Sequence, residues 1–139
     1  MLTDLRAVKS EWEQDCLRRC GAVTVAVMDH LEAAANGSTA RELGAALYAE
    51  AIAQGSGPFT SIPYVAVGDA TFENHTTWDW HARQEVTEQA CGPYLFEFAT
   101  SVEGYGVPLS RSRTEDPEGR RALEAVETGV ARVREALRP

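Results

Sequence analysis

Four side chains that can bind a metal ion or transfer a proton lie within nine residues of one another. They are Glu73, His75, Asp79 and His81. Histidine and carboxylate are common zinc ligands, and a histidine oriented by a carboxylate can act as a general base. Their spacing does not match a helical clip of the HExxH type, and no further ligand is evident nearby. We therefore expect no bound metal, no cofactor and no catalytic residue, and we keep this cluster as an alternative site.

The three cysteines offer two further chemical possibilities. Cys91 follows the histidines and could form a thiol–imidazole pair with His75 or His81. Cys16 and Cys20 are four residues apart, so they share one face of a helix and could supply two ligands of a metal site. No matching ligands accompany either arrangement, so we interpret all three as reduced, mostly buried thiols.

Composition limits the classes of partner. The chain has 139 residues and a net charge of −8, which argues against a nucleic-acid groove because phosphate binding requires a clustered basic surface. No apolar run approaches the length of a membrane span. The first fifteen residues are amphipathic and acidic, so we do not expect a signal peptide.

The first 55 residues are predicted to be helical. Residues 4–20 place apolar side chains on one stripe, and Gly21 is expected to interrupt the helix. Residues 22–28 fit either helix or strand, and we favour helix. Thr39 and Glu42 form a capping box that opens another helix, which is expected to stop at Gly55.

In the rest of the chain, the spacing of the apolar residues changes from that of helices to that of strands. Residues 61–68 and 94–102 are predicted strands, rich in β-branched and aromatic residues. Residues 78–91 fit a helix or two short strands, and residues 104–116 read as a long polar loop. Asp116 and Pro117 then predict the start of a terminal helix, whose apolar stripe we expect to face the core. That stripe includes Val126, Val130 and Val133.

These elements predict one α+β domain over residues 1–139. Its N-terminal part, residues 1–55, is helical, and residues 61–138 supply a small, mostly antiparallel sheet and the long C-terminal helix packed on one face. The sheet region holds a surplus of aromatic side chains, which interfaces use to bury area at low entropic cost. The loop adds two basic residues to an acidic chain. The predicted interface therefore consists of Trp78, Trp80, Tyr94, Phe96, Phe98, Arg111 and Arg113.

The segment Pro63 to Asp69, the polar stretch Thr77 to Trp80, the strand Leu95 to Ala99 and the Arg- and Ala-rich terminal helix resemble the tail terminator, or tail completion, proteins of long-tailed bacteriophages. The resemblance covers about residues 61–138. It implies a structural protein that forms a homomeric ring, commonly a hexamer, at the tail end or head–tail junction of a virion. Its partners would be tail-tube or connector proteins, and it would have no catalytic residues.

Two alternatives come from other classes. One is a small soluble enzyme or ligand-binding α+β domain that uses His75, Asp79 and His81, in the cytoplasm rather than in a virion. The other is a bacterial adaptor module. Solution oligomeric state together with metal content would discriminate among the three.

Overall fold

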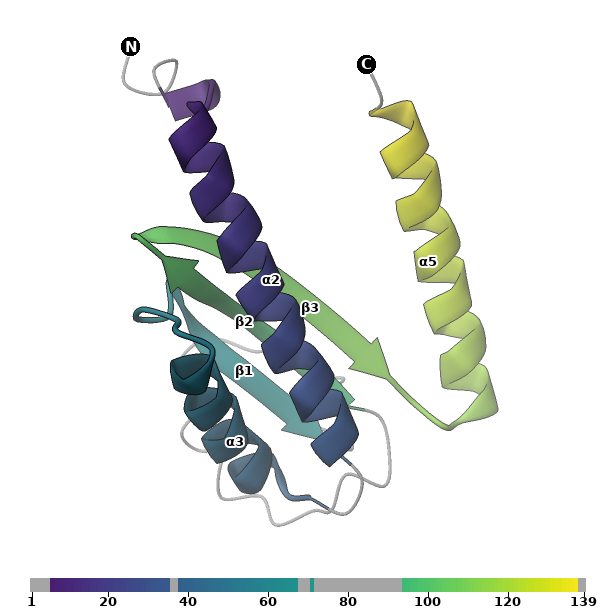
Figure 1. The fold of residues 1–139 in the computed structure, drawn as a ribbon. Helices are drawn as coiled ribbons and strands as arrows, with labels where there is room; N and C mark the ends of the chain where they lie inside the picture. Colours follow the sequence, from purple (N-terminus) through teal and green to yellow (C-terminus); the bar gives the residue numbers. More distant parts are fainter. Residues whose placement is uncertain (1–5, 36–37, 68–70, 72–93, 138–139) are drawn as a thin grey trace.

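The computed structural model describes residues 6–35, 38–67, 71 and 94–137 (Figure 1). The elements follow in the order α2 (Glu11–Ala34), α3 (Ala40–Ala53), β1 (Ser61–Val67), β2 (Tyr94–Val102), β3 (Tyr105–Arg113) and α5 (Pro117–Ala136). Helices, a three-stranded antiparallel sheet and a terminal helix confirm the predicted α+β class. The segment 78–91, predicted as helix or two short strands, lies outside the described residues.

Helix α2 is one continuous helix of 24 residues that passes through Gly21. It begins at a capping box, in which the Glu13 amide donates to Ser10 Oγ at 3.3 Å and the Ser10 amide donates to Glu13 Oε2 at 2.7 Å. The expected interruption at Gly21 is wrong, and residues 22–28 are helical. A glycine costs a helix only about 1 kcal/mol, and the buried face on both sides of Gly21 outweighs that cost.

Helix α3 begins as the sequence predicts. The Glu42 amide donates to Thr39 Oγ1 at 3.2 Å, and the Thr39 amide donates to Glu42 Oε2 at 2.7 Å, so both halves of the capping box form. The buried side of the helix carries Leu43, Leu47 and Ala51. The local signals of this helix therefore agree with its tertiary packing.

The sheet has the order β1-β2-β3, with every neighbouring pair antiparallel. Strands β2 and β3 form a hairpin whose two turn residues, Glu103 and Gly104, have φ angles of 52° and 82°. Two left-handed residues between strands are the geometry that matches the twist of a tight hairpin. The expected polar loop over residues 104–116 is therefore wrong for most of its length, because β3 occupies Tyr105–Arg113.

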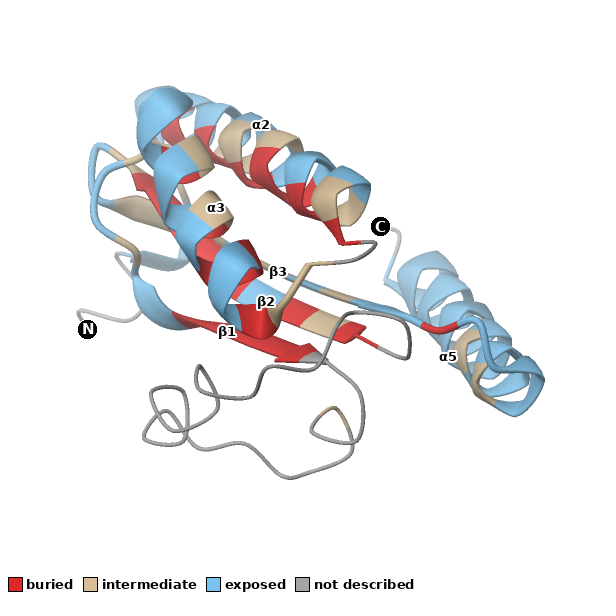
Figure 2. Cartoon of the chain, turned by 90° about the horizontal axis from the view of Figure 1, so that it is seen from below, coloured by how far each residue is buried: buried red, intermediate tan, exposed pale blue. Residues whose placement is uncertain are grey.

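The core lies between one face of this sheet and the two helices that cover it (Figure 2). Helix α2 contributes Val27 and Leu31, and the central strand contributes Phe96 and Phe98, all of them fully buried. The other face of the sheet carries no described helix. We call it the open face.

Helix α5 starts where the sequence predicts, with Asp116 as N-cap and Pro117 in the first turn. Its packing differs from the expectation, because none of its residues is buried and Val130 remains 53% exposed. In Figure 1 the helix stands beside the layers rather than on them. Among the described helices, none has the length and apolar character needed to cross a membrane.

Candidate functional site

A row of three polar side chains crosses the open face. Tyr64 on β1 pairs in register with Glu97 on β2, which pairs in turn with Ser110 on β3. Directly opposed residues of antiparallel strands project to the same face. Phe96 and Phe98 are buried among the helices, so Glu97, which lies between them, points the opposite way. Tyr64, Glu97 and Ser110 thus lie in register on three neighbouring strands, with Tyr64 only 4% exposed and Glu97 and Ser110 exposed.

Glu97 is the functional group of greatest interest in this row. It is exposed, and it lies near the middle of the central strand rather than in a loop. A rigid strand fixes the position of a carboxylate more precisely than a loop does. Such a group can pair with the ammonium of a peptide N-terminus, or serve as one oxygen ligand of a cation.

The opposite side of the hairpin carries a charged cluster that joins β3 to α2. Arg111 Nη1 lies 2.6 Å from Glu32 Oε2 and 3.3 Å from Asp29 Oδ1. Arg113 Nη1 lies 3.9 Å from Glu32 Oε1. Burial raises the pKa of the nearby Tyr94 phenol, and its hydrogen bond with Arg113 acts in the opposite direction. The two arginines, predicted to lie at an interface, thus pair with carboxylates of their own chain.

The residues of the predicted interface separate into three groups. Phe96 and Phe98 are fully buried and Tyr94 is 7% exposed, so these rings belong to the core and do not form a contact surface. Arg111 and Arg113 bind α2. Trp78 and Trp80 lie outside the described residues, as do all members of the alternative cluster: Glu73, His75, Asp79, His81 and Cys91.

The two described cysteines are free and buried in the contact between α2 and the sheet. The Cys20 thiol donates to the Thr100 carbonyl at 3.2 Å, and the Thr24 hydroxyl lies 2.7 Å from the Thr100 hydroxyl. Across the described ranges, no three His, Cys, Asp or Glu side chains converge in a way that could hold a metal ion. Cys16 and Cys20 are therefore buried thiols in the contact between helix and sheet, and Cys20 also serves as a hydrogen-bond donor.

Comparison with known proteins decides the family. The model of metallopeptidase family M24 matches residues 15–139, which is most of the chain. The chain belongs to metallopeptidase family M24. No curated protein sequence matches it.

Three solved structures share the fold. The X-Pro aminopeptidase of Thermotoga maritima MSB8 has 18% identity and a TM-score of 0.62, over 81% of this chain and 31% of that one. The prolidase of Pyrococcus furiosus has 17% identity and a TM-score of 0.66, over 84% and 34%. Icp55 of Saccharomyces cerevisiae, bound to the inhibitor apstatin, has 25% identity and a TM-score of 0.64, over 80% and 26%. The chain spans about a third or less of the length of these three proteins.

The family match overturns the phage interpretation. The resemblance to tail terminators is wrong. The predictions that depended on it are therefore wrong as well: the structural, non-enzymatic role, the homomeric ring, the tail and connector partners and the virion location. Neither alternative, the small soluble enzyme or ligand-binding domain and the bacterial adaptor module, identified this family. The shared features were short: a strand after proline, aromatic residues and a terminal helix occur in many α+β folds.

The family name implies a metal ion, and the described M24 residues do not by themselves fit one. A peptidase metal commonly takes three protein ligands. In the row on the open face, Glu97 is the single carboxylate, with a phenol and a hydroxyl beside it. Further ligands would have to come from outside the described residues, so we derive no catalytic step through a metal.

The sequence contains a signal for Glu97 that is easily passed over. The segment LFEFA alternates, and this pattern alone places Glu97 on the side of the strand opposite Phe96 and Phe98. A lone acid on the outer face of a strand is usually a solvated residue, so it does not stand out as functional. Tyr64 and Ser110 could not be added, because their alignment with Glu97 depends on strand pairing, which involves residues far apart in sequence.

Proposed function

We propose that the chain forms part of an M24 peptidase that cleaves X–Pro bonds at the N-terminus of peptides. The observation that supports this is the family match over residues 15–139. The substrate class follows the names of the solved structures with the same fold, X-Pro aminopeptidase and prolidase. The activity would belong to an M24 domain longer than these 139 residues, since this chain covers only 31% and 34% of those two relatives.

The open face gives this proposal a location. A peptide substrate of an aminopeptidase carries a free ammonium group, and Glu97 presents a carboxylate on an exposed strand face. We propose that the face lines the substrate cleft and that Glu97 contacts the substrate or a cation within it. Opposite charges attract, which would favour binding of the charged N-terminus at this carboxylate.

The test is hydrolysis of an X-Pro dipeptide and an X-Pro-X tripeptide by the protein isolated from cells that make it. Mn²⁺, Co²⁺ and Zn²⁺ are each added to the metal-free protein. We expect Glu97→Gln to lower kcat/KM at least 100-fold and to leave the melting temperature unchanged, because the side chain is exposed. Glu103→Gln, at the turn of the same hairpin, is the matched control and should keep full activity.

The outcomes separate the two parts of the proposal. Failure to hydrolyse either peptide with any of the three metals would refute the peptidase assignment. Full activity in Glu97→Gln would leave the peptidase intact and remove Glu97 from its site.

A further inference from the structure

The open face presents one carboxylate, whereas a metal ion in a protein needs several ligands. Strand pairing decides which side chains share this face with Glu97, because opposed residues and residues two apart along a strand project to the same side. None of these neighbours is an aspartate, glutamate, histidine or cysteine, the side chains that bind most protein metals. They are Tyr64 and Ala66 on β1, Leu95 and Ala99 on β2, and Pro108, Ser110 and Ser112 on β3.

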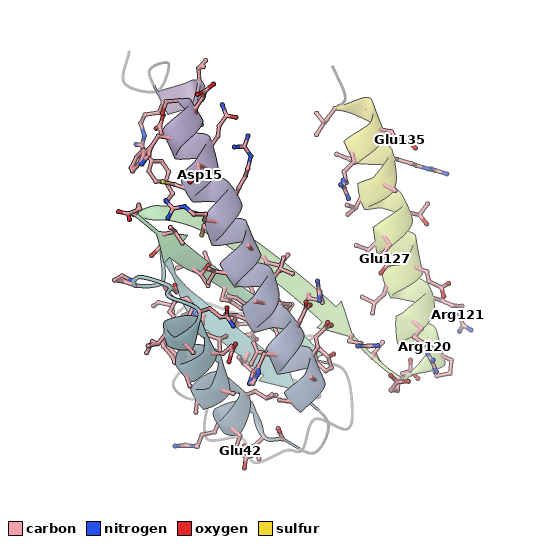
Figure 3. The ribbon with its side chains drawn as sticks, viewed as in Figure 1. Asp15, Glu42, Arg120, Arg121, Glu127 and Glu135 are labelled. Carbon is pink, nitrogen blue, oxygen red and sulfur yellow. The ribbon has the colours of Figure 1, made fainter. Side chains whose placement is uncertain are left out.

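Other acids close to the hairpin in sequence or in space do not reach Glu97. Asp29 and Glu32 pair with Arg111 on the side of the sheet that the helices cover. Glu103 lies at the hairpin turn, about 20 Å along the strand from Glu97. In Figure 3, Asp15 and Glu42 lie on the helices of the covered face, and Glu127 and Glu135 lie on α5 beside the layers.

Two acids at the start of α5 border the open face without joining Glu97. Asp116 and Glu118 line a cavity together with Leu95, and Glu97 is not among the residues that line it. The Asp116 carboxylate also caps the helix, since it accepts from the Gly119 amide at 2.7 Å. Glu97 therefore has no second acid beside it in the part of the chain that the structure describes, in agreement with the lack of a three-ligand cluster there.

The pair formed by Glu97 and Ser110 suits an ammonium group better than a metal ion. The two residues are directly opposed and exposed, so their Cβ atoms lie about 4.5–5.5 Å apart and face the same space. An ammonium group has three N–H donors, and the carboxylate and the hydroxyl can accept two of them. A catalytic metal normally takes three protein ligands, and this pair offers it one charged oxygen ligand.

We infer that Glu97 and Ser110 bind the N-terminal ammonium of a peptide directly and that the strands hold no metal ion beside it. In this respect the chain departs from the metallopeptidases of its family. The inference rests on the proposed function for the nature of the peptide. It adds that the open face recognises the N-terminus of that peptide without a metal.

The first experiment measures peptide binding in the presence of EDTA, with protein isolated from the cells that make it. The probe is an Ala-Pro-Ala peptide that carries fluorescein at its C-terminus, and fluorescence anisotropy gives Kd. We expect acetylation of the N-terminus to weaken binding at least tenfold, and Glu97→Gln to do the same. Glu103→Gln is the matched control and should leave Kd within twofold of the wild type.

A second probe separates the two sources of an ammonium group. It is an acetylated peptide that begins with lysine and therefore carries only a side-chain ammonium. We expect it to bind as weakly as the acetylated Ala-Pro-Ala peptide. Equal binding of this probe and the free peptide would overturn the inference, as would no binding in EDTA or an unchanged Kd in Glu97→Gln.

The second experiment titrates Mn²⁺, Co²⁺ and Zn²⁺ into the chelator-stripped protein by calorimetry. We expect the same metal affinity in the wild type and in Glu97→Gln. A metal whose affinity falls at least tenfold in Glu97→Gln would overturn the inference. Ser110→Asp places a second carboxylate opposite Glu97 and should raise Mn²⁺ affinity at least tenfold. No gain in this variant would show that the two positions do not converge, which would also overturn the inference.

The peptidase assay distinguishes this inference from the proposed function. Binding of the free N-terminus in EDTA, without X-Pro hydrolysis by any added metal, would support the inference and refute the function. Hydrolysis that requires a metal bound through Glu97 would support the function and refute the inference.

Discussion

Phe96 and Glu97 are neighbours in sequence and lie in opposite environments. The Phe96 ring is fully buried and stacks on Tyr94, with ring centroids 4.6 Å apart. Glu97 points to the open face, where no described helix lies. A strand separates adjacent residues in this way because its side chains alternate, so one segment can build the core and furnish a site at once.

At the residue scale we predict that Phe96→Ala destabilises the chain by about 3–5 kcal/mol, through lost burial and the cavity left behind. Leu95→Ala, on the half-buried open face, should cost clearly less. Urea unfolding followed by circular dichroism measures both values. Equal losses would show that the two faces of β2 are equally buried, contrary to the structure.

At the element scale, each of the two capping boxes joins the N-terminus of a helix to the ionised carboxylate of a glutamate in its first turn. The Glu42 carboxylate accepts from the Thr39 amide and hydroxyl, and these hydrogen bonds lower its pKa below the ordinary value of 4.5. Glu13 forms the same contacts with Ser10 and also accepts from the Tyr105 hydroxyl at 2.9 Å, so its pKa is lowered as well. Because the pKa is depressed in the folded state, each carboxylate stabilises the fold when it is ionised.

The pH dependence of the folding stability follows from the direction of this pKa shift. The contribution of Glu42 should be fully present above pH 4.5 and be lost as the pH falls through the lower folded-state pKa. Glu42→Gln keeps the hydrogen-bonding shape without the charge, so its free energy of unfolding should approach that of the wild type as the medium becomes acidic. Urea titrations from about pH 3 to about pH 7 measure the difference.

Thr39→Ala is the control for this measurement. In that background the main partner of Glu42 is gone, so Glu42→Gln should have little effect at any pH. A pH-dependent difference that persists without Thr39 would show that the cap does not lower the pKa.

The elements differ in how far sequence could predict them. Helix α3 and the start of α5 follow from caps, which are local signals between residues three apart. Strand β3 cannot be predicted from local signals, because Gly106, Pro108 and the polar residues in YGVPLSRSR suggest a loop. It is an edge strand, where proline is tolerated, and its pairing with β2 supplies what its own composition lacks. Nonlocal pairing also aligns Glu97 with its row, which no local pattern could show.

At the scale of the whole molecule, the position of α5 changes the expected effect of a charge in its stripe. The sequence pattern alone predicts that Val130→Asp buries a carboxylate and unfolds the chain. The structure leaves Val130 half exposed, so we predict that this variant stays within about 0.5 kcal/mol of the wild type. Val27→Asp, at a fully buried position of α2, should cost several kcal/mol.

Thermal melts of the two purified variants test this contrast. Similar large losses in both would mean that the stripe of α5 is covered within the chain itself. The prediction that residues 1–139 form a single domain stays a prediction.

The paired cysteines of α2 have a practical consequence. Both thiols have no exposed surface in the folded state, and they lie where the helix meets the sheet. An alkylating reagent can reach them only when the helix lifts from the strands. The rate at which the two thiols are alkylated, measured by peptide mass spectrometry, therefore reports the rate of that opening. This measurement would follow local separation of α2 from the sheet that contains Glu97, without any added label.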